Sequence, residues 1–148
     1  MAKRQPKLQI ESIPVSSWGI NLANLLEKEE WTQIRKRVYK EAGYSCTKCG
    51  QDNEALNAHE EWLFNEKAKT QRLVGIVCVC GMCHDCIHFL RSTQVHDKEY
   101  IKKVIGHFMR VNKWTVEEFN KHYALAQQLA SKRADRRYKV LAGGRQLL

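Results

Sequence analysis

The sequence predicts an α+β fold in which a small core of two strands and one helix is flanked by α-helices at both ends. Two Cys-x-x-Cys pairs bracket two strand-like segments, and helical apolar patterns lie before the first pair and after the second. Strands and helices that occur in separate runs are typical of α+β domains. We expect a single domain at residues 21–148, preceded by an extended arm at residues 1–20 that contains both prolines.

The helix before the core is predicted at residues 24–42. Trp31, Ile34 and Val38 fall on one helix face, and Gly43 stands where a helix end favours a residue with positive φ. The chain is therefore expected to leave the helix at Gly43 and enter the core.

The core is predicted at about residues 44–92. Residues 55–64 alternate apolar and polar side chains, and residues 72–80 are rich in β-branched side chains, so both segments are expected to be strands. A helix is predicted to begin just after Cys83 and to end near Leu90.

Two helices are predicted after the core, in an extension at about residues 97–138 that ends in a short basic tail. The first helix, residues 97–112, has one apolar stripe. The second begins with a capping box, in which Thr115 is followed three residues later by Glu118, and it is expected to reach Arg137.

Composition and charge limit the classes of protein. Hydrophobic residues make up 43% of the chain and include four tryptophans, as in folded domains. Residues 1–20 carry no secretory signal, and no apolar stretch is long enough to cross a membrane. We therefore expect a soluble, cytoplasmic protein whose cysteines are thiols or metal ligands rather than disulfides. The net charge of +9 predicts a polyanionic partner such as nucleic acid.

Basic side chains cluster near the C-terminus, at residues 131–139. These side chains can contact phosphates through charge alone, which predicts binding to a nucleic-acid backbone without sequence specificity. The alternative is an ordinary solvated helix face. The predicted contacts are Lys132, Arg133, Arg136, Arg137 and Lys139.

The two Cys-x-x-Cys pairs predict a structural zinc site. Each pair offers two thiolates at the spacing that tetrahedral zinc accepts, and together they complete a set of four: Cys46, Cys49, Cys80 and Cys83. A redox-active pair is the alternative. Cys78 and Cys86 are left over, and we interpret them as small buried hydrophobes, although either could replace one of the four.

The histidines predict a second metal site. His84 and His88 are spaced i, i+4, so on a helix they project from one face and can chelate one ion, although two helical histidines can also be purely structural. His59 lies in the first predicted strand and can join them if the two strands pair and pack on the helix.

Other candidate residues have plainer interpretations. Trp31 and Trp62 are expected in the core rather than as stacking platforms. The remaining histidines, His96, His107 and His122, lack partner spacing and are expected to be surface or helix residues.

Together these motifs resemble the HNH, or His-Me finger, endonucleases, which have a ββα-metal core. The resemblance is strongest to a little-characterised branch found in many bacteria and phages, and it covers about residues 31–130. That branch combines AHE-x-W, Gln-x-Leu, Cys-x2-Cys-His-x3-His and VN-x-W, which here read AHEEW, QRL, CGMCHDCIH and VNKWTVEEF. The resemblance implies a zinc-stabilised ββα-metal core, DNA as the substrate, and the cytoplasm of a bacterium or phage-infected cell.

Residue by residue, the resemblance implies that His59 is the general base that takes a proton from the attacking water. His84 and His88 would hold a divalent cation, either Mg²⁺, Mn²⁺, Ni²⁺ or Zn²⁺, beside the scissile phosphate. The four cysteines would bind a separate zinc ion that stabilises the fold.

The chain departs from the family pattern at two positions. Ala58 stands where active enzymes carry another metal ligand, and Gly75 stands where they carry the asparagine that orients the base. Asn57, Glu60 and Glu61 are nearby side chains that could compensate. Two functions follow: a metal-dependent endonuclease, or a catalytically degenerate zinc protein that binds nucleic acid or a protein partner in a regulatory or phage counter-defence role. A redox protein is a third, and the chain lacks its βαβ pattern.

Overall fold

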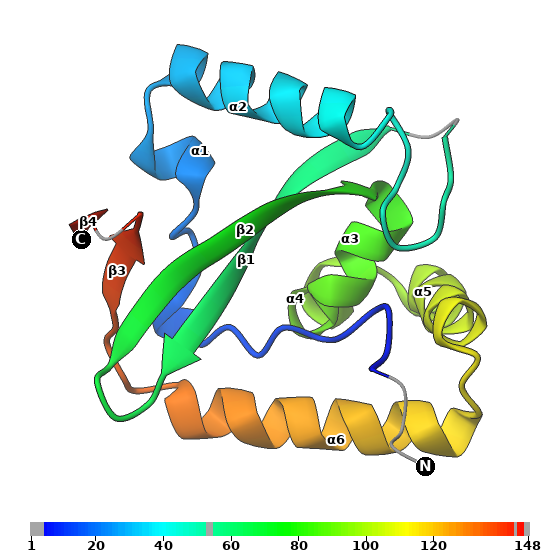
Figure 1. The fold of residues 1–148 in the computed structure, drawn as a ribbon. Helices are drawn as coiled ribbons and strands as arrows, with labels where there is room; N and C mark the ends of the chain where they lie inside the picture. The colour runs from blue at the N-terminus through cyan, green and yellow to red at the C-terminus, as the bar shows by residue number, and fades with distance from the viewer. Residues whose placement is uncertain (1–4, 53–54, 144, 147–148) are drawn as a thin grey trace.

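The centre of the molecule is a long antiparallel hairpin of β1 (Leu56–Asn65) and β2 (Thr70–Cys80), shown in green in Figure 1. The computed structural model describes residues 5–52, 55–143 and 145–146. Both predicted strands are confirmed, and the fold is α+β. The register places Ala58 opposite Cys78 and His59 opposite Val77, and it shifts at a bulge after Glu61.

Two short strands extend the hairpin into a mixed sheet. Strand β3 (Lys139–Ala142) pairs parallel to β2, and β4 (Arg145–Gln146) pairs antiparallel to β3, which gives the order β1-β2-β3-β4. The sequence had predicted a helical extension to residue 138 and a basic tail, so these strands are a correction. Val140 is fully buried in β3, which explains why the segment pairs with the sheet.

The helix predicted at residues 24–42 is two helices. Helix α1 (Leu22–Leu25) is a single turn, and α2 (Lys28–Glu41) follows after Leu26, whose backbone is extended. The break lies at Leu26 and Glu27, whose backbones are not helical. The start of α1 is fixed separately, because Asn21 caps the backbone N–H of Asn24 and Glu60 accepts the backbone N–H of Leu22. The predicted end of α2 is confirmed, because Gly43 adopts a φ of +65°.

The helix expected to begin after Cys83 begins earlier and is also broken. Helix α3 (Gly81–Ile87) starts directly after Cys80, because the sulfur of Cys80 accepts the backbone N–H of Cys83. His88 then leaves helical geometry, with φ −92° and ψ 36°, and α4 (Phe89–Val95) continues in a new direction. Helix α3 packs against β1, β2 and α5, so it lies at the centre of the fold.

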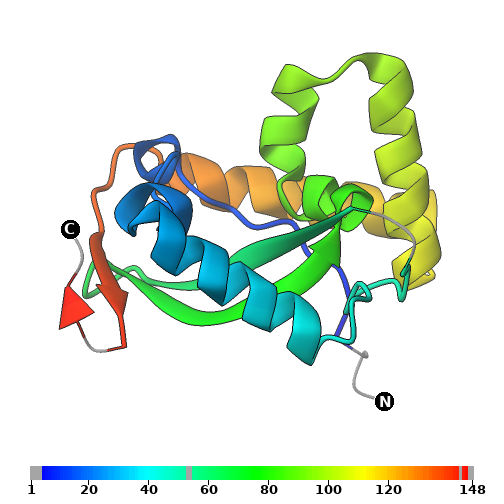
Figure 2. The same cartoon turned by 90° about the horizontal axis from the view of Figure 1, so that it is seen from above.

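The two C-terminal helices agree with the sequence at their starts. Helix α5 (Lys98–Asn112) is capped by Asp97, and α6 (Val116–Arg133) has the predicted capping box between Thr115 and Glu118. Helix α6 ends at Arg133 rather than near Arg137. Viewed from above, α4 and α5 stand side by side away from the hairpin (Figure 2). No helix in the described part of the chain is long and apolar enough to cross a membrane.

The N-terminal arm is extended over most of its described length, as predicted, but it is also part of the core. It runs between the hairpin and α6 (Figure 1), and Leu8 and Ile10 pack in the main apolar cluster. Asn112 makes two hydrogen bonds to the backbone of Leu8, and the backbone N–H of Ile10 donates to His122 Nε2 at 2.9 Å. His122 is a helix residue, as expected, and its ring also has a hydrogen-bond partner far away in the sequence.

Candidate metal centres

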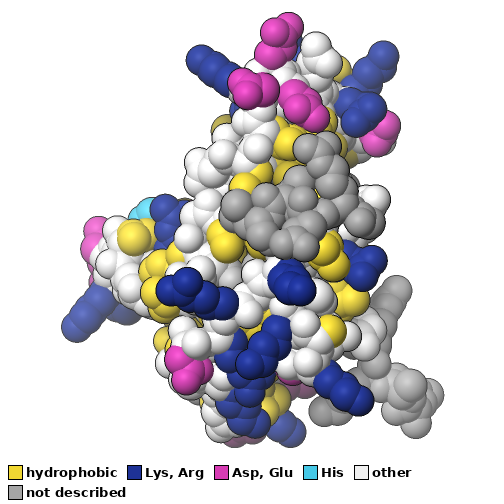
Figure 3. All heavy atoms as spheres, turned by 90° about the vertical axis from the view of Figure 1, so that its left-hand side faces the viewer, with side chains coloured by type: hydrophobic (Ala, Val, Ile, Leu, Met, Phe, Trp, Pro, Cys, Tyr) yellow, Lys and Arg dark blue, Asp and Glu magenta, His cyan; other side chains and the backbone are white. Residues whose placement is uncertain are grey.

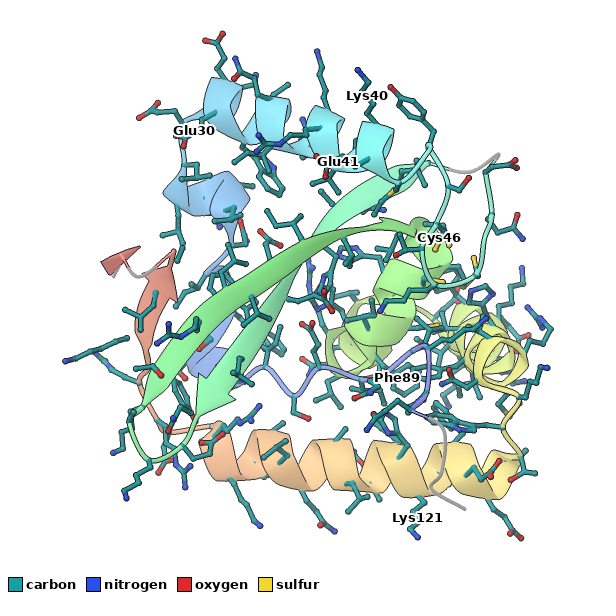
Figure 4. All side chains as sticks on the ribbon, in the orientation of Figure 1. Glu30, Lys40, Glu41, Cys46, Phe89 and Lys121 are labelled. Carbon is teal, nitrogen blue, oxygen red and sulfur yellow. The ribbon has the colours of Figure 1, made fainter. Side chains whose placement is uncertain are left out.

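The first candidate centre is formed by the two Cys-x-x-Cys pairs, which lie at the end of β2 and in the loop after α2. Figure 4 shows the sulfur atoms gathered beside Cys46. The first pair forms a tight turn in which Gly50, at φ +83°, donates its backbone N–H to the carbonyl of Cys46. Thr47 fixes this turn to β2, because its backbone N–H and hydroxyl both donate to the carbonyl of Cys78 at 2.9 Å.

The distances between the four sulfur atoms suit one tetrahedral ion. The ligand atoms all lie within 4.8 Å of one another, and the sulfurs of Cys49 and Cys80 are 3.6 Å apart. Two thiolates about 2.3 Å from a tetrahedral zinc ion are separated by roughly 3.8 Å. A disulfide needs about 2.05 Å, and all six cysteines are free thiols. The four are therefore positioned to hold a metal ion, as predicted.

Electrostatics also favour a cation among these thiols. Burial opposes ionisation of Cys46, but backbone N–H groups, chiefly of Cys49 and Cys80, outweigh it and lower its pKa to about 7. Burial raises the pKa of Cys49 to about 11. Burial, followed by the charges of Cys46 and Cys80, also raises the pKa of Cys83. Several thiolates at this distance repel one another, and a bound cation relieves that repulsion.

The neighbouring cysteines contribute packing. Cys78 and Cys86 are buried, as expected, and Cys86 lies against the carbonyl of Val104. His107 is a helix residue of α5, as expected, and its Nε2 lies 3.2 Å from the sulfur of Cys83, a contact that its sequence spacing did not indicate. A histidine N–H in contact with a metal-binding sulfur stabilises the thiolate from outside the ligand set.

The second candidate centre is formed by His59 on β1 and by His84 and His88 at either end of one turn of α3. Their nearest ring nitrogens all lie within 4.8 Å of one another. The ring centroids of His84 and His88 are 4.6 Å apart, and that of His59 is 4.9 Å from His88. The three histidines therefore meet as the sequence predicted. The spacing admits either three ligands on one ion or two ligands beside a general base.

The two helical histidines are neutral at physiological pH. Burial, followed by the charge of His59, lowers the pKa of His84 to about 4. The same causes, with an added contribution from His84, lower the pKa of His88 to about 3. A neutral imidazole keeps a lone pair free, which is the form that binds divalent ions.

A carboxylate that sequence reasoning missed completes the cluster. Glu11, on the N-terminal arm, places Oε1 2.7 Å from His59 Nε2. Because a carboxylate oxygen accepts, His59 donates through Nε2–H and keeps its lone pair on Nδ1. That Nδ1 is buried without a hydrogen-bond partner among the described residues. Glu11 is 48 residues from His59 in an arm without periodicity, so no sequence pattern could have indicated it.

The structure shows what surrounds Ala58 and Gly75, the two residues that depart from the family pattern. Ala58 is buried beside His59, and its methyl group offers no ligand. A Cβ built on Gly75 would lie 3.3 Å from Glu61 Oε1, so the carboxylate of Glu61 occupies the space beside this glycine. Glu60 accepts a hydrogen bond from α1. Glu11, rather than Asn57, Glu60 or Glu61, is the side chain that orients His59.

The histidine cluster opens into a cavity of about 690 Å³. Its walls come from the arm, α1, α2, β1 and α4, and they include Trp18, Trp31, Trp62 and Arg91. The four-cysteine cluster does not line this cavity. Trp31 and Trp62 are only half-buried, so the expectation that they belong to the core is wrong.

The five basic residues predicted to contact nucleic acid fall into two groups. Lys132, Arg137 and Lys139 are exposed. Arg133 and Arg136 instead bind Glu66, at 2.5 and 2.6 Å. Figure 3 shows Lys and Arg side chains gathered on the lower half of the face that carries β3. The exposed group is therefore available to a polyanion, and the paired group fixes the end of α6 to the turn between β1 and β2.

A scan of protein-family models, a search of curated proteins and a search of solved structures each gave no match to this chain.

Proposed function

We propose that this protein is a metal-dependent endonuclease of the HNH kind, which hydrolyses phosphodiester bonds in DNA with little sequence specificity. One observation carries the proposal: His59, His84 and His88 converge within 4.8 Å at the edge of a cavity. Open sites with a few nitrogen ligands are typical of catalytic metals, whereas closed four-sulfur sites are structural.

The arrangement of elements supports the same proposal. An antiparallel hairpin leads directly into a helix, with one histidine on the first strand and two on the helix. A ββα-metal core has this order. The four cysteines are proposed to bind zinc. Such an ion would join the loop after α2 to the end of β2 and the start of α3, and so hold α3 against the hairpin.

Each residue of the proposed site has a separate role in the hydrolysis. A divalent ion bound by His84 and His88 would supply positive charge beside the scissile phosphate. His59 Nδ1 takes a proton from water, the water oxygen attacks phosphorus, and the bond to the 3′ oxygen breaks. The 3′ oxygen leaves as an alkoxide, which the positive charge of the ion would stabilise until the alkoxide takes a proton from solvent. Glu11 holds the imidazole of His59 in the tautomer that leaves Nδ1 free, as carboxylates commonly do for histidines at metal sites. The exposed Lys132, Arg137 and Lys139 bind the nucleic-acid backbone.

A second candidate function is a degenerate HNH-like zinc protein that binds nucleic acid or a protein partner without cleaving it. Ala58 favours it, because the first strand lacks a further ligand beside His59. In this case all three histidines hold a second tightly bound zinc ion. The stoichiometry of tightly bound zinc therefore separates the two functions, with one ion for the nuclease and two for the binding protein.

Plasmid nicking tests the proposal. We expect purified protein to nick a supercoiled plasmid when Mg²⁺, Mn²⁺ or Ni²⁺ is added, and His59→Ala to lower the rate by about 10²–10⁴-fold, the usual contribution of a general base. His96→Ala is the matched control, because His96 lies outside the cavity walls. The no-metal arm omits the ion instead of adding a chelator, so that structural zinc is retained. Absence of nicking by wild-type protein that retains zinc and binds DNA would favour the second function.

A further inference from the structure

Three of the four tryptophans of the chain line the cavity beside the histidine cluster. Trp18 follows the 3-10 turn η1 (Val15–Ser17) and is 40% exposed, and Trp31 and Trp62 are half-buried. The fourth, Trp114, is also half-buried, but it packs against the main apolar cluster and stacks on Phe108, with 5.4 Å between ring centroids. Indole rings are usually buried in the core or at an interface, so three around one open cavity suggest a ligand with flat faces.

The polar groups of the cavity suit a phosphate at one end. Arg91 lies on α4, one turn after His88, and borders the cavity with its side chain exposed. Two carboxylates also line the cavity. Each of them already has a hydrogen-bond donor. Glu11 accepts from His59, and Glu60 accepts the first backbone N–H of α1.

We propose that this cavity binds an unpaired stretch of nucleic acid, with bases stacked on the tryptophans and a phosphate between Arg91 and the histidine cluster. The inference rests on the proposed function and narrows its substrate to strands that are single-stranded or locally opened. Bases in an intact duplex have their faces covered by neighbouring base pairs, whereas unpaired bases can stack on aromatic side chains. A cavity of about 690 Å³ also falls within the size range of pockets that enclose small ligands.

Fluorescence anisotropy with three labelled oligonucleotides of about 12 nucleotides, within the site size of a small single-strand-binding domain, tests this inference. The first is a single strand of thymidylates, the second is the same strand with abasic sites at its centre, and the third is a blunt duplex. No divalent ion is added, so that no cleavage occurs. We expect the thymidylate strand to bind at least about tenfold more tightly than the abasic strand, which is the loss associated with one base–aromatic stack. The duplex should also bind more weakly than the thymidylate strand.

Substitutions in the cavity sharpen the test. Trp18→Ala and Trp62→Ala should each weaken binding of the thymidylate strand by about tenfold and leave binding of the abasic strand unchanged. Trp62→Phe keeps a stacking ring on β1 and should retain most of the affinity. Tyr44→Asn is the matched control, because Tyr44 is an exposed aromatic residue outside the cavity walls, and asparagine tolerates its φ of 58°. Zinc content and thermal unfolding show that each variant is folded.

The outcomes separate this inference from the proposed function. Equal affinity for the thymidylate and abasic strands, stronger binding of the duplex, or unchanged binding by both tryptophan variants would overturn the inference. Any of these results together with metal-dependent nicking would leave the nuclease proposal in place. Base-dependent binding without nicking would support the inference and remove the nuclease proposal.

Discussion

The two clusters of metal-binding side chains lie next to each other in the sequence but differ in their surroundings. Cys80 and Cys83 are followed directly by His84 and His88, so one short helix supplies both clusters. Each cluster mixes buried and partly exposed residues, since Cys49 is partly exposed and His59 is 2% exposed. The clusters differ in that the histidines line a cavity of about 690 Å³ and the four cysteines do not. A closed site can only hold its ion and stabilise the fold, and an open one leaves room for a reacting ligand.

The clusters also differ in what supports them. The cysteines are held by local turns, in which backbone N–H groups of Cys49 and Cys83 donate to the sulfurs of Cys46 and Cys80. The histidines depend on segments far apart in the sequence, since Glu11 reaches His59 from the N-terminal arm. We therefore expect the first cluster to determine stability and the second to determine activity.

The largest effect is expected from Cys83→Ala. Structural zinc contributes about 10–16 kcal/mol of binding free energy, which is comparable with the whole stability of a domain, about 5–15 kcal/mol. We expect this variant to lose the zinc ion that we propose for the cysteine cluster, and with it the cooperative thermal transition. Cys86→Ala, three residues along the same helix and equally buried, should retain zinc and lose only about 1–2 kcal/mol of unfolding free energy. Equal losses in the two variants would show that the first cluster is ordinary core packing.

The next effect concerns the second cluster alone. His84→Ala combined with His88→Ala should weaken binding of Mn²⁺ or Ni²⁺ by at least about 100-fold, because both imidazoles are proposed to bind the ion directly. The free energy of unfolding should change by about 1 kcal/mol or less, since both side chains border a cavity. Isothermal titration calorimetry measures the first quantity and zinc content serves as the control. Loss of the structural zinc in this variant would contradict the independence of the two clusters.

A smaller effect is expected from Glu11→Ala, which removes the long-range support of the second cluster. Loss of a carboxylate that orients a histidine at a metal site typically costs 10–100-fold in activity or metal affinity, so we expect a drop of about that size in nicking. Nitrogen NMR of His59 should show a changed Nε2 resonance, because the Nε2–H group has lost the carboxylate that accepts its hydrogen bond. Gln9→Ala, an exposed position on the same arm, is the control. An unchanged Nε2 resonance would show that Glu11 acts only in packing.

The smallest expected effect is a dependence of the free energy of unfolding on pH through His122. Burial lowers the pKa of His122 below its ordinary value of 6.5, and the neutral Nε2 accepts the backbone N–H of Ile10. The unfolded chain therefore binds more protons than the folded one as pH falls below 6.5, so the stabilisation is complete above that pH and is lost below it. We expect the free energy of unfolding to fall by up to about 1 kcal/mol below that pH, which is the net contribution of one hydrogen bond. Urea midpoints measured between about pH 5 and 7 should show a smaller slope in His122→Gln, whose amide does not titrate.

Much of the fold could be predicted from the chain because the signals are local. The two strands, the capping box at Thr115 and the end of α2 at Gly43 all follow from neighbouring residues. The clusters of metal-binding residues could be predicted for the same reason. Cys-x-x-Cys spacing fixes the reach of two thiols, and i, i+4 spacing places His84 and His88 on one face.

Other features required the tertiary structure because their partners are distant in the sequence. Strand β3 pairs with β2, which is distant in the sequence, and its Val140 is fully buried. The two breaks at Leu26 and His88 interrupt otherwise helical patterns. Arg133 and Arg136 look like free basic residues until Glu66 is seen beside them.

The sequence by itself determined which residues can bind metal, since the chemistry of a thiol or an imidazole and its local spacing are properties of the chain. Only the tertiary structure decided how each cluster is used. Burial closes the cysteine cluster, Glu11 selects the free nitrogen of His59, and three tryptophans from different segments surround the cavity. These contacts depend on packing between segments that no short-range pattern relates.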